Sequence, residues 1–166
     1  FPWLLIGLLG GILGALVLGS QEDALKNVTE LAFFIPLIAA MGGNVGVQSS
    51  SIVVQSIASG VKNVETTGKR LLKELLIALS TAAIFAVLIF VYNFLSQGNL
   101  DLTFSVSISL FIVILFASFF GTLIPLVLDR FKIDPALATG PFITTMNDVM
   151  GLMIYLMIGK MFFGIL

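Results

Sequence analysis

Long apolar runs, separated by short polar connections, dominate the pattern of this sequence. Five of the runs reach the roughly 20 residues of helix that are needed to cross a hydrocarbon core. We expect membrane-spanning helices at residues 2–19, 28–58, 71–95, 104–128 and 135–163. The pattern therefore predicts an all-α membrane protein with five transmembrane helices, organised as a single transmembrane domain over residues 1–166.

The second and fifth runs are longer than a straight span requires, and both contain proline and glycine. Pro36 lies in the second run, and Gly140 and Pro141 interrupt the fifth. Because proline lacks an N–H group, it leaves the carbonyl four residues earlier without its usual helical partner. We therefore expect the second and fifth helices to be broken or kinked.

Composition supports the membrane assignment and removes several classes of chemistry. The 166 residues are 58% hydrophobic and only 10% charged, and the mean hydropathy is +1.15. A soluble domain of this size could not cover so much apolar surface with so few charges. The absence of cysteine and histidine removes disulfides and both thiolate and imidazole metal sites. A net charge of −1 with scattered basic residues predicts no nucleic-acid partner.

Basic residues gather in alternate connections, and this predicts the orientation of the chain. The connections 59–74 and 129–134 hold most of them: Lys62, Lys69, Arg70, Lys73, Arg130 and Lys132. Cytoplasmic loops carry the excess of Lys and Arg. We therefore expect a multi-pass protein of the cell membrane (the inner or plasma membrane), with its N-terminus in the cytoplasm and its C-terminus on the extracellular or periplasmic side. The apolar run begins at once at Phe1, and we expect this to be the membrane portion of a longer protein.

Four polar residues of the second run recur on one helical face. Asn44, Gln48, Ser51 and Gln55 are spaced i, i+4, i+7 and i+11. Hydrogen bonding between helices would account for one such contact, but four polar residues exceed that need. We therefore favour a face that lines water or a pore. Gly43, beside Asn44, belongs to a glycine-rich stretch that permits close packing or an unwound backbone.

A single carboxylate, Asp148, lies deep in the fifth run. A bare charge at that depth costs several kcal/mol at least, and no Lys or Arg lies at the same depth in any run. Gly140, Thr144, Asp148 and Gly151 share one helical face, so carbonyl, hydroxyl and carboxylate oxygens form a column. Such hard donors suit Mg²⁺, Ca²⁺ and Mn²⁺. A protonated and silent aspartate is the alternative.

One carboxylate is a poor match for a divalent ion, and this favours an assembly of two chains. A two-fold homodimer would bring two Asp148 side chains together on its axis, with two negative charges for two positive ones. Because Mg²⁺ sheds water reluctantly, we expect a central pore that holds it largely hydrated. The remaining candidate pore-lining residues are Asn44, Gln48, Gly43, Thr145, Asn147 and Gly151.

Two stretches, PLIAAMGGNVGVQ at 36–48 and DPALATGPFITTMNDVMGLMIY at 134–155, resemble the membrane domain of the MgtE family of magnesium channels. The similarity runs the whole chain, and its specific part is the motif Gly-Pro-x-x-Thr-Thr-x-x-Asp-x-x-Gly in the fifth run. The resemblance implies a homodimer in membrane lipid with a central pore. It also implies cytoplasmic N and CBS domains upstream in the full-length protein.

The resemblance further implies roles for individual residues. The motif carboxylate of the family, which holds hydrated Mg²⁺ at the selectivity site of the pore, falls on Asp148. Oxygens of Thr144 and Gly140 are then expected to face the ion. Some relatives carry Asn where this chain has Gly140, and often Thr and Asn where it has Val45 and Val47. These departures leave the preference among Mg²⁺, Mn²⁺, Co²⁺ and Ca²⁺ open.

The leading hypothesis is a dimeric divalent-cation channel that conducts Mg²⁺ into the cytoplasm down its electrochemical gradient. An inside-negative potential supplies about 4.6 kcal/mol per 100 mV to a doubly charged ion. The alternative is an ion- or proton-coupled exchanger with Asp148 as the carrier carboxylate. An intramembrane aspartyl protease requires two catalytic aspartates in neighbouring spans, whereas only Asp148 lies deep in a span, so we do not expect an enzyme.

Overall fold

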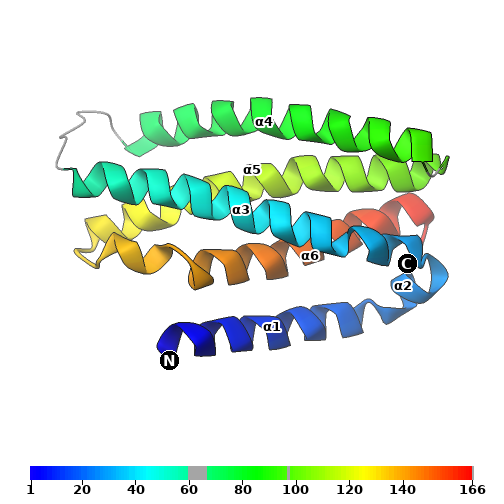
Figure 1. Cartoon of the computed structure of the whole chain (residues 1–166), viewed down its shortest axis with the longest axis horizontal. Helices are drawn as coiled ribbons and strands as arrows, with labels where there is room; N and C mark the ends of the chain where they lie inside the picture. Colours follow the sequence, from blue (N-terminus) through cyan, green and yellow to red (C-terminus); the bar gives the residue numbers. More distant parts are fainter. Residues whose placement is uncertain (60–66, 97, 166) are drawn as a thin grey trace.

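The computed structural model describes residues 1–59, 67–96 and 98–165, and the described chain is helical. Its elements are α1 (Pro2–Ser20), α2 (Glu22–Asn27), α3 (Glu30–Ala58), α4 (Thr67–Ser96), α5 (Leu100–Arg130), the 3₁₀ helix η1 (Pro135–Ala138) and α6 (Pro141–Phe163). The long helices run side by side along the long axis of the molecule (Figure 1). Lys62, one of the basic residues used to predict orientation, lies outside the described residues.

Four of the described helices, α3, α4, α5 and α6, are long and apolar enough to cross a membrane. They match the second to fifth expected spans, and the predicted class of helical membrane protein is confirmed. The first expected span corresponds to α1, which has 19 residues. Its described apolar stretch, Leu4–Ser20, is shorter than the other four, so a membrane crossing by α1 stays a prediction.

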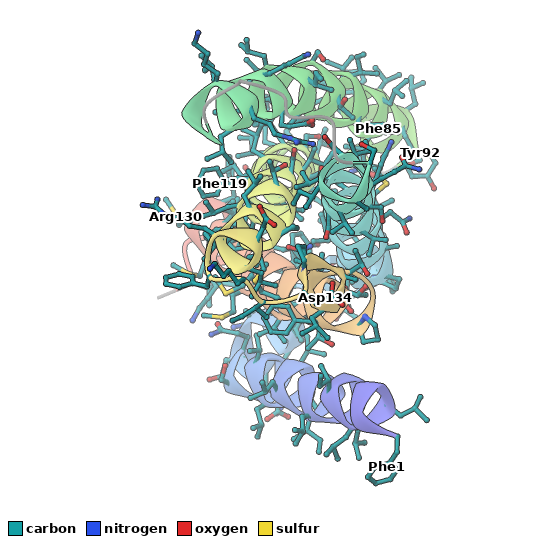
Figure 2. All side chains as sticks on the ribbon, turned by 90° about the vertical axis from the view of Figure 1, so that its left-hand side faces the viewer. Phe1, Phe85, Tyr92, Phe119, Arg130 and Asp134 are labelled. Carbon is teal, nitrogen blue, oxygen red and sulfur yellow. The ribbon has the colours of Figure 1, made fainter. Side chains whose placement is uncertain are left out.

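The helix α5 lies at the centre of the packing and contacts α3, α4 and α6, while α1 packs against α6. Figure 2 shows α4 and α1 at opposite sides of the bundle, with the other long helices between them. The core is built from buried side chains of α3, α5 and α6, including Leu31, Ile38, Val106, Ile114 and Leu156. Because lipid is as apolar as leucine, close packing and hydrogen bonds rather than the hydrophobic effect hold such helices together.

Two glycines allow α3 to approach its neighbours closely. A Cβ added to Gly121 of α5 would lie 2.6 Å from the Gly46 carbonyl oxygen of α3. A Cβ added to Gly46 would overlap the amide of Asn147 on α6. Small residues at such crossings let helix backbones meet. This junction therefore determines how α3 and α6 lie relative to each other, and these two helices carry the predicted site.

The two helices for which we expected a break differ in the structure. In the second, α3 continues as one α-helix through Pro36, and a bend of its axis stays a prediction. The fifth expected span consists of η1 and α6, separated by Thr139 and Gly140. Gly140 has φ 74° and ψ −134°, a conformation that glycine adopts at little cost. Pro141 then occupies the first turn of α6, where its missing N–H has no partner to lose.

Candidate functional site

A groove of about 420 Å³ lies between α3 and α6. It is lined by Thr144 and Asp148 of α6 and by Ala39, Ala40, Gly43, Asn44, Val47 and Gln48 of α3. The structure therefore brings together five of the predicted site residues, from segments about a hundred positions apart in the sequence. Ala39 and Ala40 were not among the candidates, although their place one turn before Gly43 and Asn44 puts them on the same face of α3.

Helical periodicity explains the two walls of the groove. Thr144 and Asp148 are four residues apart on α6, as are Asn44 and Gln48 on α3, so each pair lies on one face. Gly43 provides the space between the walls. A Cβ at this position would lie 3.3 Å from Thr144 Cγ2 and 3.5 Å from Asp148 Oδ1. The carboxylate of Asp148 thus lies directly against the backbone of α3.

The Thr144 hydroxyl is oriented by the turn that starts α6. Its Oγ1 donates to the Gly140 carbonyl at 3.1 Å, and the Thr144 backbone N–H donates to the same oxygen at 3.1 Å. Because its proton is used in this bond, the hydroxyl oxygen keeps its lone pairs as an acceptor. The Gly140 carbonyl already accepts two hydrogen bonds, and Gly140 is not part of the groove lining. Contact of that carbonyl with an ion stays a prediction.

Three other candidate pore residues lie away from this groove within the single chain. Thr145 faces α1, where a Cβ added to Gly10 would overlap its side chain. Asn147 is buried, 1% exposed, and its amide packs against Gly46. Gly151 is buried against side chains of α3 and α5. Successive residues of a helix are turned by about 100°, so the neighbours of Asp148 point toward other helices.

Asn147 is the clearest departure from the sequence prediction. Neither atom of its side-chain amide has a hydrogen-bond partner among the described residues. The polar residue next to the motif carboxylate suggested a pore wall, but the side chain lies at the junction of α3 with α6. The feature of the sequence that indicates this packing is the glycine spacing of α3, because Gly42 and Gly46 form the surface against which Asn147 packs.

Asp148 has no basic partner within the described part of the chain. The one salt bridge found there joins Lys26 to Glu22 at 2.7 Å on the exposed surface of α2. No group of three or more metal-binding side chains of the His, Cys, Asp or Glu type occurs among the described residues. One chain therefore offers a single carboxylate, half-buried at the edge of an open groove.

The polar stripe predicted on the second span is exposed on the surface of the single chain. Asn44, Gln48, Ser51 and Gln55 are all exposed along α3. Hydrocarbon cannot form hydrogen bonds with amides and hydroxyls, so polar groups at membrane depth face water or protein rather than lipid. This face of α3, together with the groove beside it, requires either a covering partner or an aqueous space.

Comparison with known proteins gives a consistent assignment. A family model described as "MgtE: Divalent cation transporter" matches residues 35–158. A protein of Bacillus subtilis named "Magnesium transporter MgtE" is 38% identical over 161 residues, which cover 97% of this chain and 36% of the relative. Proteins of the same name from Enterococcus faecalis and Thermus thermophilus are 35% and 32% identical, over 97% and 96% of this chain.

The aligned region is a much larger share of this chain than of its relatives. Nearly the whole of this chain is covered, whereas it spans only about a third of the length of the curated relatives, with 36% and 35% of their sequences aligned. The family model covers well over half of the chain and includes both walls of the groove. The chain therefore belongs to the MgtE family of divalent cation transporters.

Proposed function

We propose that two copies of this chain form a pore for Mg²⁺ in a cell (inner or plasma) membrane, with the two Asp148 carboxylates holding a hydrated ion. The observation that carries this proposal is the open groove with Asp148 at its wall, in helices long enough to span a membrane. A second copy related by a two-fold axis would close the groove and supply the second negative charge. The name of the relatives, magnesium transporter, supports Mg²⁺ as the ion.

The size of the groove supports a hydrated rather than a bare ion. Six waters at about 30 Å³ each occupy about 180 Å³, and the groove of one chain measures about 420 Å³. Mg²⁺ gives up its first-shell water reluctantly, so the expected contacts run through that water. The side-chain oxygens that line the groove are those of the Asp148 carboxylate, the Thr144 hydroxyl and the amides of Asn44 and Gln48.

The proposed direction of transport is into the cytoplasm. The start of α4 and the end of α5 lie at the same end of the bundle (Figure 1), and both carry basic residues. Figure 2 looks onto this end, where Arg130 and Asp134 are labelled. The positive-inside rule makes it the cytoplasmic end. An inside-negative potential then drives a doubly charged ion inward with about 4.6 kcal/mol per 100 mV.

The full-length protein is proposed to carry cytoplasmic N and CBS domains upstream of this membrane domain. The cytoplasmic position of the N-terminus follows from the same orientation. The greater length of the relatives leaves room for such domains. Since those domains lie outside this chain, the groove accounts for permeation and selectivity, and regulation of opening is assigned to the rest of the protein.

The proposal is tested by recording Mg²⁺ currents from the protein reconstituted in planar bilayers. Asp148→Asn keeps the size of the side chain and removes the charge, and we expect loss of Mg²⁺ selectivity. The matched control is Asp129→Asn, which removes a carboxylate from the exposed end of α5 and should leave selectivity unchanged. Selective Mg²⁺ currents from Asp148→Asn would refute the pore assignment. Flux that follows a proton or sodium gradient at fixed voltage would establish a coupled exchanger instead.

A further inference from the structure

A second and smaller pocket adjoins the Asp148 groove. It has a volume of about 90 Å³ and lies between α3, α4 and α5. Its polar lining residues are Gln48, Ser49, Glu74, Thr81 and Ser118, and the others are apolar. Gln48 lines this pocket and the Asp148 groove alike. The pocket and the groove therefore meet at the Gln48 side chain. A ligand in the pocket that holds Gln48 in one conformation also changes the wall of the groove.

Glu74 brings a carboxylate into this pocket without a basic partner among the residues that the structure describes. Arg70, one helical turn earlier on α4, instead donates from Nη1 to Ser56 Oγ at 3.0 Å. The salt bridge between Lys26 and Glu22 is the one found in the described ranges. Glu74 is half-buried near the start of α4, and its side chain lines the pocket. It therefore gives the pocket one negative charge, which a cation would balance.

Three hydroxyls also line the pocket, and two of them are buried. Ser49 and Ser118 are 7% and 3% exposed, and Ser49 Oγ donates to Ser118 Oγ at 3.3 Å. Thr81 Oγ1 donates to the Ile77 carbonyl at 3.0 Å. Ser49 and Thr81 donate their hydroxyl protons in these bonds and Ser118 accepts one, so each of the three oxygens keeps a lone pair for a cation. The donor set is thus carboxylate, hydroxyl and amide oxygen, which suits hard cations.

Size and charge distinguish the ion that this pocket accepts from the ion of the groove. The pocket has a volume of about 90 Å³, against about 420 Å³ for the groove, so it accepts an ion with fewer waters than the hydrated Mg²⁺ proposed for the groove. A single carboxylate also balances only one positive charge. We infer that the Glu74 pocket binds a monovalent alkali cation such as Na⁺, distinct from the divalent ion of the groove. Its occupancy holds Gln48 in place at the groove wall.

The inference is tested by thermal unfolding of the purified protein in sodium chloride, with N-methyl-D-glucamine chloride at equal ionic strength as the reference. N-methyl-D-glucamine is too large for the pocket, so any general salt effect is common to both. We expect Na⁺ to raise the Tm of the wild type by about 3 °C or more at saturation. Glu74→Gln should lose this rise, while Asp129→Asn should keep it, because Asp129 is exposed on α5 outside the pocket.

A second variant keeps the result decisive if Glu74→Gln fails to fold. Ser118→Ala retains the charge and removes one oxygen, and should raise the Na⁺ concentration for half of the effect several-fold. Equal stabilisation of the wild type and both pocket variants by Na⁺ would overturn the inference. So would a wild type whose Tm does not respond to Na⁺. Asp148→Asn should keep the Na⁺ response, so failure here and failure of the proposed Mg²⁺ pore are distinguishable.

Discussion

Asp148 of α6 lies against Gly43 of α3, with its Oδ1 3.5 Å from the point where a Cβ at Gly43 would be. The same Cβ would lie 3.3 Å from Thr144 Cγ2. The absence of a side chain at position 43 therefore keeps the space in front of the carboxylate open. Two helices far apart in sequence meet here, and their contact defines the width of the groove.

Enlarging residue 43 should narrow the proposed pore. The alanine of Gly43→Ala is tolerated only if Thr144 shifts by a few tenths of an ångström, whereas the branched side chain of Gly43→Val would occupy the groove. We expect a modest loss of unitary Mg²⁺ current for Gly43→Ala and a loss of about tenfold or more for Gly43→Val. Single-channel recording measures both. Gly11→Ala, where no atom lies within 4 Å of the added Cβ, is the control; unchanged current from Gly43→Val would remove this residue from the ion path.

The Thr144 hydroxyl should contribute to ion affinity through its oxygen rather than through its bulk. Thr144→Val keeps the shape of this groove residue and removes its hydroxyl acceptor, whereas Thr144→Ser keeps the acceptor. We expect Thr144→Val to raise the Mg²⁺ concentration for half-maximal current by about 5-fold to 10-fold, in line with one lost hydrogen bond of about 1 kcal/mol. Thr144→Ser should stay close to the wild type. Identical concentration dependence in all three proteins would show that the hydroxyl does not contact the hydrated ion.

The junction of Gly46 with Asn147 should govern stability. The methyl group of Gly46→Ala would overlap the Asn147 amide, and overpacking of this kind costs about 1–3 kcal/mol. Thermal unfolding in detergent should show a lower Tm for Gly46→Ala. Adding Asn147→Ala should recover most of the loss, because the amide that clashes is gone. Purely additive effects of the two substitutions would contradict this contact, and Gly7→Ala, which meets no atom within 4 Å, should be neutral.

One hydrogen bond joins the start of α3 to the second half of α6. The Tyr155 hydroxyl donates to the Leu31 carbonyl at 2.8 Å, and both residues are fully buried. Hydrogen bonds within membrane proteins contribute about 0.6–1.7 kcal/mol. We therefore expect Tyr155→Phe to destabilise the protein by about 1 kcal/mol, measured by denaturant unfolding, with Mg²⁺ current intact. Tyr92→Phe, at a position that is 59% exposed, should have no measurable effect, and equal stability of both variants would argue against the bond.

The polar face of α3 should be in contact with water in the assembled protein. The chain contains no cysteine, so any introduced thiol is unique. Asn44→Cys and Gln55→Cys are expected to react quickly with a charged, membrane-impermeant thiol reagent. Leu88→Cys on α4, 58% exposed in the single chain but expected to face lipid, should react at least about tenfold more slowly, because a thiol in hydrocarbon does not ionise. Similar rates at all three positions would be incompatible with an aqueous pathway along α3.

Most of the helical fold, and the shared face of two groove residues, could be predicted from the sequence for definite reasons. The four long spans are set by runs of apolar residues whose length matches the bilayer, and backbone hydrogen bonding in lipid leaves helices as the solution. The placement of Thr144 and Asp148 on one face follows from the 3.6-residue period alone. The break before α6 follows from Gly140 and Pro141, whose backbone restrictions are local.

What the tertiary structure decided is which faces of the helices meet. Periodicity assigns Asn147 and Gly151 to the vicinity of Asp148, but the close crossing of α3 at Gly46 directs Asn147 into a helix interface. The adjoining pocket around Glu74 depends on three helices, and no pattern within one of them indicates it. Sequence periodicity is a property of a single helix, whereas contacts between helices depend on how small and large side chains fit across a crossing. For this protein the sequence by itself determined the four long spans and the position of Asp148 within the last of them. Packing between helices decided which residues lie beside the Asp148 carboxylate.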